Sequence, residues 1–345
     1  MEPMYYIGLD IHKRKISYCV KDGSGQLHAE GSIPASRHDL DCWMKTLPQP
    51  WSAAMEATLF TGWIYDHLQP HAAALKVAHP LMLRAIAAAK RKNDRIDANK
   101  ICDCLRCDFL PECYVAPTAI RERRRILRYR NLLVRQMVQM KIKTGSLLME
   151  AGVSYNKERL HKAAYFRELL ATHPDIDESL RSLLRQCRET VLRLSKTENA
   201  LIRSLQRDRL LAERVERLMS IPAIGPITAL TWALEVGDVR RFSSNKKAVS
   251  YCGLCGAEKS SGNTVRRMPL SKQRNKHLQT TLIEAAKMAP RFSATLALLY
   301  DREKKKGNAN RATLAVARKL VAYLVAVDRG QTHFLVLDRE SSIAA

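Results

Sequence analysis

The stretch Arg91-Lys-Asn-Asp94-Arg-Ile-Asp97-Ala-Asn-Lys-Ile-Cys102 follows an alanine-rich helical run and keeps helical spacing. Asp94 and Asp97 are three residues apart, so a helix places both carboxylates on one face. Two adjacent carboxylates repel each other unless a cation lies between them, and oxygen ligands suit Mg²⁺ or Mn²⁺. The alternative is a solvated face, with Asp94 as the helix N-cap and Asp97 paired to Lys100 or Arg91. Acids elsewhere in the chain decide between the two.

Two such acids end predicted strands upstream. Apolar, β-branched and aromatic residues predict strands at 5–10 and 51–56, which end at Asp10 and Glu56. Three further strands and two helices are predicted, the strands at 15–21, 26–33 and 74–78 and the helices at 36–47 and 62–68. Three antiparallel strands, followed by strands alternating with helices, indicate an α/β layered domain.

The four acids together form a D-E-D-D set: Asp10, Glu56, Asp94 and Asp97. This arrangement is similar to that of RNase H-like nucleases of the RuvC type, in which strands and a following helix bring carboxylates to two metal ions. Four converging carboxylates are strongly destabilising without metal. Two cations about 3.5–4 Å apart would bind the attacking and leaving oxygens of a phosphoryl displacement. Taken singly, Asp10 is also typical of a turn and Glu56 of a helix N-cap.

The charge of the chain points to a polyanionic partner. Its 345 residues carry a formal net charge of +24, and no apolar run of about 18 residues or signal peptide is present. Nucleic acid is therefore favoured over a membrane surface. The length of the chain predicts two or three domains. Nine cysteines without a secretion signal indicate free thiols in a reducing cytoplasm. A zinc knuckle is conceivable, but small buried apolar side chains are favoured.

A helical segment at 119–143 carries nine basic residues against the single acid Glu122. With so much uncompensated charge we expect a track for a nucleic-acid backbone, although basic helical faces are often merely solvated. The basic residues of this segment are Arg121, Arg123, Arg124, Arg125, Arg128, Arg130, Arg135, Lys141 and Lys143.

Beyond it, residues 177–219 show heptad-like apolar spacing without glycine or proline, interrupted at Glu198 and Asp208. This pattern predicts one long coiled-coil arm, which either folds back within the chain or contacts a second copy. The stretch Ser220-Ile-Pro-Ala-Ile-Gly225-Pro-Ile-Thr-Ala229 resembles a helix-hairpin-helix, with Ala223 where the first glycine is usual. A plain Pro-Gly helix junction is the alternative.

The C-terminal third adds a second group of motifs: Gly253-Leu254, Ser261-Gly262 and Ser271-Lys-x-x-Asn275. Together with Ile7-Gly-Leu-Asp10, Met55-Glu-Ala-Thr58, the D-x-x-D stretch and Ile221-Pro-x-Ile-Gly225, they occur in the order and spacing of one family. The chain resembles the bridge-RNA-guided insertion-sequence recombinases, DEDD transposases that include the Piv/MooV DNA invertases. Two family glycines differ, one displaced to Gly62 and one replaced by Arg267.

The resemblance implies three domains: a RuvC-like DEDD domain at 1–160, a coiled-coil linker at 161–212 and a mainly α transposase domain at 213–345. It implies that Ser261 is a nucleophile; from composition alone it would be a turn serine. It also implies binding of DNA and a structured guide RNA, and homodimers that assemble into tetramers, with one protomer's acids facing another's serine. Phosphate contacts are then expected from Arg266, Arg267, Lys272 and Arg274.

Two other functions fit parts of the same pattern. A metal-dependent RuvC-like nuclease or junction resolvase would use the four acids and water, without a covalent intermediate. A non-catalytic nucleic-acid-binding protein would keep the acids for structure. The function that we predict is an RNA-guided transposase that cuts and rejoins DNA with metal-bound carboxylates and a serine.

Overall fold

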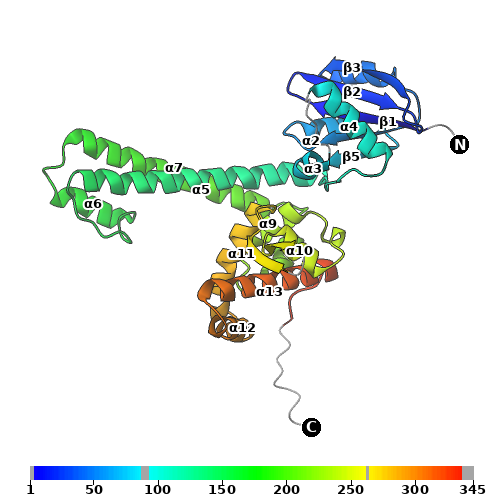
Figure 1. The fold of residues 1–345 in the computed structure, drawn as a ribbon. Coiled ribbons are helices and arrows are strands. Elements are labelled where there is room, and N and C mark those ends of the chain that lie inside the picture. The colour runs from blue at the N-terminus through cyan, green and yellow to red at the C-terminus, as the bar shows by residue number, and fades with distance from the viewer. Residues whose placement is uncertain (1–3, 87–92, 262–263, 336–345) are drawn as a thin grey trace, which may run out of the picture. The chain divides into compact units, whose positions relative to one another are not determined.

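The computed structural model describes residues 4–86, 93–261 and 264–335 and divides into two compact units, Met1–Thr118 and Ala119–Ala345 (Figure 1). The boundary lies before the basic helix, whereas the sequence placed residues 119–160 with the catalytic domain. Within the residues that the structure describes, none of the helices is both long and apolar enough to cross a membrane.

The N-terminal unit is built on one mixed five-stranded sheet with the order β3-β2-β1-β4-β5. β1 pairs antiparallel with β2 and parallel with β4; β2–β3 is antiparallel and β4–β5 parallel. The strands are β1 Tyr5–Ile11, β2 Lys15–Lys21, β3 Leu27–Pro34, β4 Trp51–Glu56 and β5 Ala74–Ala78. The predicted α/β N-terminal sheet is confirmed.

Each face of the sheet is covered by its own layer of helices, and the side chains of β1 point alternately to the two layers. Ile7 and Leu9 pack with α1 (Arg37–Met44) and α2 (Thr61–Leu68) in one apolar core. The opposite face carries α4 (Asp94–Arg106) and, near β4 and β5, α3 (Pro80–Ile86). Figure 1 shows α4 lying across the sheet. Successive side chains of a strand point to opposite faces, so Gly8 and Asp10 lie on the α4 side.

Gly8 lets α4 approach the sheet closely. A Cβ atom at this position would lie 2.0 Å from the carbonyl oxygen of Ala98 and 2.4 Å from the backbone nitrogen of Cys102. Only glycine leaves room for helix backbone at that distance. The position of Asp94 relative to β1 therefore depends on a residue without a side chain.

α4 begins as a new helix instead of continuing an earlier one. Asn93 has an extended backbone, with φ −152° and ψ 160°, and its side chain accepts a hydrogen bond from the Ile96 N–H. The expected unbroken helical run into Asp94 is therefore wrong, and Asn93, not Asp94, is the N-cap. Arg91 and Lys92 lie outside the described residues. The i, i+3 placement of Asp94 and Asp97 on α4 is as expected.

The second unit begins with a helical hairpin. α5 (Thr118–Glu150) runs out, α6 (Ala163–Thr172) lies at the tip, and α7 (Glu178–Gln206) returns beside α5 (Figure 1). Arg130 of α5 pairs with Glu198 of α7, at 2.8 Å. Of the two arrangements that the heptad pattern left open, the described chain shows the internal hairpin.

The predicted single helix over 177–219 is wrong, because α7 stops at Gln206 and α8 (Ala212–Met219) is separate. The Asp208 side chain accepts from the Leu210 N–H, and its carbonyl accepts from the Leu211 N–H. Aspartate readily makes such local bonds, which compete with helix continuation.

The remaining helices enclose the largest core of the second unit, which contains Trp232, Leu282 and Leu320. They are α9 Pro226–Val236, α10 Asn245–Tyr251, α11 Lys276–Met288, α12 Ala294–Lys305 and α13 Ala309–Gly330, with short 3₁₀ turns at Val239–Arg241 and Ala289–Arg291. The helical character predicted for the C-terminal region is confirmed. A two-stranded hairpin, β6 Gly256–Ser261 and β7 Thr264–Leu270, was not predicted. In the turn before α9, Ala223 takes the left-handed φ of 68° that favours glycine.

Candidate active site

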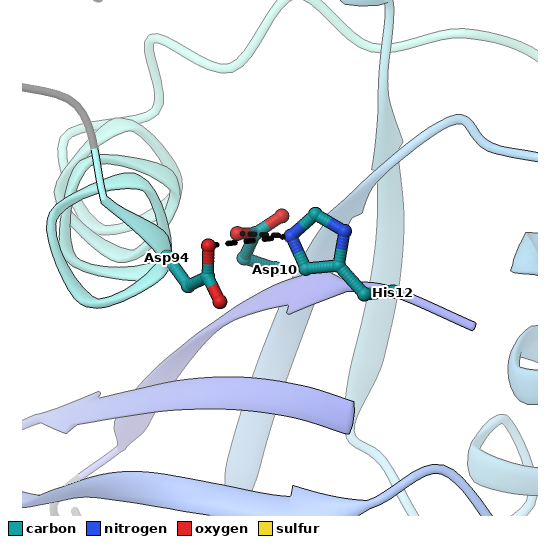
Figure 2. A group of neighbouring side chains, drawn as sticks. All are labelled: Asp10, His12 and Asp94. Carbon is teal, nitrogen blue, oxygen red and sulfur yellow. Dashed lines mark hydrogen bonds and ion pairs between the residues drawn. The ribbon is translucent and has the colours of Figure 1, made fainter. Parts of the chain in front are cut away.

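Two of the four predicted acids meet at the end of β1, together with a histidine. Ligand atoms of Asp10, His12 and Asp94 all lie within 4.8 Å of one another. His12 Nε2 is 3.2 Å from Asp10 Oδ2 and 3.5 Å from Asp94 Oδ1. Figure 2 shows the imidazole pointing toward both carboxylates. β1 and the first turn of α4 thus bring together groups that are 84 residues apart in the chain, at Asp10 and Asp94.

The electrostatics of this cluster favour a cation. Burial raises the pKa of Asp10 above 3.8, His12 lowers it, and the charges of Asp94 and Asp97 raise it further. The Asp10 side chain is 15% exposed, and Lys15 Nζ lies 3.8 Å from Asp94 Oδ2. Carboxylate oxygens are ligands of Mg²⁺ and Mn²⁺, whereas an imidazole nitrogen suits softer divalent ions. The residues present therefore fit a divalent cation.

The other two acids flank the cluster without joining it. Glu56 ends β4, one residue after Met55, which pairs with Leu9 of β1. Asp97 lies one turn along α4 from Asp94, and its carboxylate is 3.6 Å from Lys100 Nζ. Neither belongs to the 4.8 Å group among the described residues.

His12 was missed by the sequence analysis. The available signal was its spacing, because residues two apart in an extended segment point to the same side.

Comparison with known proteins gives the family. Residues 7–152 match the DEDD transposase domain of IS110 elements, and residues 215–301 match the Transposase IS116/IS110/IS902 family. The chain carries the two domains of an IS110-family transposase. It is 26% identical to the transposase for insertion sequence element IS1328 of Yersinia enterocolitica over 331 residues, 92% of this chain and 96% of that protein. A probable family 20 transposase of Pseudomonas aeruginosa is 25% identical over 293 residues, 84% of this chain and 85% of that one.

The prediction of an insertion-sequence transposase with a DEDD domain is therefore confirmed. A third relative, the transposase for insertion sequence element IS1111A of Coxiella burnetii, is 33% identical over 115 residues, about 31% of this chain and 30% of that protein. Because transposases cut and transfer DNA, DNA binding and strand cleavage follow from the family.

In this transposase, Ser261 is the last residue of β6 and its backbone pairs with Thr264 of β7. Its side chain and the following Gly262 lie outside the described residues. Ser260 donates a 2.7 Å hydrogen bond to Glu258. Of the expected phosphate contacts nearby, Arg266, Lys272 and Arg274 are exposed, and the Arg267 side chain lies outside the described part.

The basic helix of the transposase does not form the free track expected from its sequence. Arg128 makes two 2.8 Å hydrogen bonds to the carboxylate of Glu235, which is 1% exposed. Arg124 donates to the carbonyl of Leu234 at 2.8 Å, and Arg123 pairs with Asp208 at 2.8 Å.

With Arg130 on Glu198, four of the nine cations thus attach α5 to α7, α9 and the turn after α7. Arg121 is half-buried, whereas Arg125 and Arg135 are exposed and no ion pair of theirs occurs in the described ranges. The nucleic-acid track on α5 is therefore narrower than predicted.

The cysteines are free thiols in the structure. Cys19, Cys102 and Cys252 are buried, and Cys102 Sγ lies 3.1 Å from the carbonyl oxygen of Tyr6. No cysteine belongs to a metal-ligand group in the described parts of the chain. Cys102 is thus the small buried side chain that was expected, whereas Cys107 is exposed.

Proposed function

We propose that this transposase is a site-specific DNA recombinase of an insertion sequence, which cuts and rejoins DNA with metal-bound carboxylates and a serine nucleophile. The observation that carries the proposal is the convergence of Asp10 and Asp94 with His12 at the C-terminal end of β1. Two further features support an RNase H-like domain of the RuvC type. One is the strand order with an antiparallel β2, and the other is the placement of the acids on β1, on β4 and on a helix across the sheet.

In this proposal the protein holds the metal through Asp10, Asp94 and His12, with Glu56 and Asp97 completing the DEDD set. A bound Mg²⁺ or Mn²⁺ would polarise the scissile phosphate and stabilise the leaving oxygen. Partial burial leaves the Asp10 side chain only 15% exposed, and Gly8 fixes the distance between β1 and α4. Lys15 beside Asp94 compensates part of the negative charge.

The serine step conserves the phosphodiester. The Ser261 oxygen bonds to the scissile phosphorus as the bond from phosphorus to the deoxyribose oxygen breaks, and that oxygen leaves as a hydroxyl with the proton that the serine gives up. The resulting phosphoserine ester is then attacked by the hydroxyl of a new strand, which restores free serine.

The proposal includes two further parts. A structured guide RNA selects the DNA partners, and homodimers assemble into tetramers. Both rest on the resemblance to bridge-RNA-guided recombinases. The net charge of +24 supports binding of more than one polyanion.

The test is a denaturing gel of labelled DNA carrying the ends of the element, incubated with Mg²⁺ and the full chain. Wild type should give cleaved strands and a covalent protein–DNA adduct. Ser261→Ala should lose the adduct and strand exchange, whereas the matched control Ser260→Ala should retain both. Asp97→Asn should lose cleavage and keep DNA binding, because the amide retains shape but not charge.

Two outcomes would change the proposal. Cleavage by wild type without any adduct would identify a metal-dependent nuclease or junction resolvase that uses water. Equal loss of DNA binding and cleavage in Asp97→Asn would contradict a metal-site role. Mixing Ser261→Ala with Asp10→Asn should restore activity if different protomers supply the acids and the serine.

A further inference from the structure

A depression of about 280 Å³ lies beside the acid cluster, within the N-terminal unit. It is formed by β2, the edge strand β3 and the first turn of α4. Its lining residues are Lys15, Ser17, Glu30, Gly31, Ser32 and Arg95. None of them was assigned a role by the sequence analysis.

The sheet register connects this depression to Asp10. Ser17 of β2 pairs with Asp10 of β1 on one side and with Ser32 of β3 on the other. Directly opposed residues of neighbouring strands present their side chains on the same face, about 5 Å apart from strand to strand. A row of polar side chains therefore runs from Asp10 through Ser17 to Ser32 at the edge of the sheet.

The hydroxyl groups of this row have unused hydrogen-bonding capacity. In the described part of the chain, neither the Ser17 nor the Ser32 hydroxyl has a hydrogen-bond partner. Ser17 is only 3% exposed as a residue, but its hydroxyl is not among the buried side-chain atoms that lack a partner, so this oxygen is open to the depression that Ser17 lines. Both hydroxyls can donate to an acceptor that enters the depression.

The charge of the lining suits an anion. Lys15 is half exposed and reaches Asp94 only at 3.8 Å. The negative charge of Glu30 is compensated by Arg95, which donates to it through Nε at 2.7 Å and through a second, shorter contact from Nη2. The guanidinium has five N–H donors, so donors remain for another acceptor. The N-terminal turn of α4 adds positive potential.

We propose that this depression binds a backbone phosphate of the DNA strand that the neighbouring acids cut, so that the strand passes from the acid cluster across β2 and β3. The inference rests on the proposed function, because it takes Asp10 and Asp94 as the cutting site. Hydroxyl, ammonium and guanidinium donors are the groups that contact phosphates in protein–DNA complexes. Among the residues that the structure describes, no apolar side chain lines the depression to hold a base.

The test uses salt dependence of DNA binding by the full chain in EDTA, where no cleavage occurs. Lys15→Gln should reduce the slope of log affinity against log salt by about 0.9 on duplex DNA, or about 0.7 on a single strand, because one phosphate contact is lost. Lys15→Arg should keep the wild-type slope. The matched control Lys45→Gln, an exposed lysine at the end of α1 on the other side of the sheet, should leave the slope unchanged.

The serines give a second readout. The double variant Ser17→Ala, Ser32→Ala should bind DNA about tenfold more weakly with an unchanged slope, because two neutral hydrogen bonds are lost and no charge is. A scan with single neutral methylphosphonates should locate the contacted phosphate. At that position the methylphosphonate should weaken DNA binding by the wild-type protein but not by Lys15→Gln. Such non-additive effects of the two changes indicate direct contact between Lys15 and that phosphate.

An unchanged slope in Lys15→Gln, or additive losses at every methylphosphonate, would overturn the inference. If the slope is unchanged in Lys15→Gln and cleavage is lost in Asp97→Asn, the phosphate site is overturned and the proposed metal site is still supported. Wild-type cleavage by Asp97→Asn would overturn the proposed function. A reduced slope in Lys15→Gln would then still place a phosphate in the depression.

Discussion

The substitution Gly8→Ala should damage both the stability of the N-terminal unit and the chemistry of its acids. The new Cβ would lie 2.0 Å from the Ala98 carbonyl oxygen, whereas carbon–oxygen contacts between backbones are ordinarily about 3.3–3.6 Å. α4 would therefore have to retreat by about 1.3 Å from β1. Overpacking of this kind costs about 1–3 kcal/mol. Because the obstacle is helix backbone and not a flexible side chain, we expect about 3 kcal/mol, or about a hundredfold in the folding equilibrium.

The same displacement carries Asp94 away from Asp10. A misplacement of about 1 Å at a reacting centre can cost about a hundredfold in rate, so Mg²⁺-dependent cleavage should fall by about that factor. Affinity for DNA should change little, because the exposed cations are untouched. The loss of activity should exceed the loss of binding.

Hydrogen exchange followed by mass spectrometry measures the stability of β1 and α4 separately from the rest of the chain. Gly23→Ala is the matched control, because an added Cβ there meets no atom within 4 Å. We expect the control to change the free energy of opening by no more than about 0.5 kcal/mol. Wild-type protection of α4 and wild-type cleavage in Gly8→Ala would refute the argument.

Three further predictions concern the charges of the second unit. Glu235→Ala should lower the free energy of unfolding by about 1.5–3 kcal/mol in urea denaturation, because it removes the charged hydrogen bonds of Arg128, whose side chain is half exposed and can be solvated in their place. Burial alone would raise the pKa of Glu235, but Arg128 and Asn275 outweigh it and hold the pKa below 4.5, so stability present above pH 4.5 should be lost as the pH falls through the lowered value; urea unfolding at decreasing pH measures this loss. Arg125→Ala and Arg135→Ala should each lower the salt slope of DNA binding by about 0.9, whereas Arg128→Ala should act mainly on stability.

Much of the N-terminal sheet was predictable because its signals are local. The bounds of β2, β4 and β5 agree with the predicted ranges 15–21, 51–56 and 74–78. Alternation of apolar residues and turn residues such as Asp22-Gly-Ser-Gly25 determine such strands over a few positions. The two strand-end acids were found for the same reason.

The partners of charged side chains were not predictable. Arg128 and Glu235 are 107 positions apart, and nothing in the local sequence distinguishes Arg128 from the exposed Arg125. The heptad pattern is interrupted at Asp208 and resumes after it, so one helix was predicted across a position where the chain turns. Periodicity records apolar spacing and not the local hydrogen bonds of a carboxylate. The sequence thus predicts the sign of each charged side chain better than whether that side chain pairs within the protein or stays free to contact nucleic acid.

Anomalous diffraction from crystals of the full chain soaked in Mn²⁺ tests the central claim most directly. We predict a metal peak within coordination distance of the carboxylates of Asp10 and Asp94, with His12 Nε2 turned toward it, and no such peak in Asp10→Asn crystals. A Mn²⁺-soaked wild-type crystal with no peak between these two carboxylates would contradict the account.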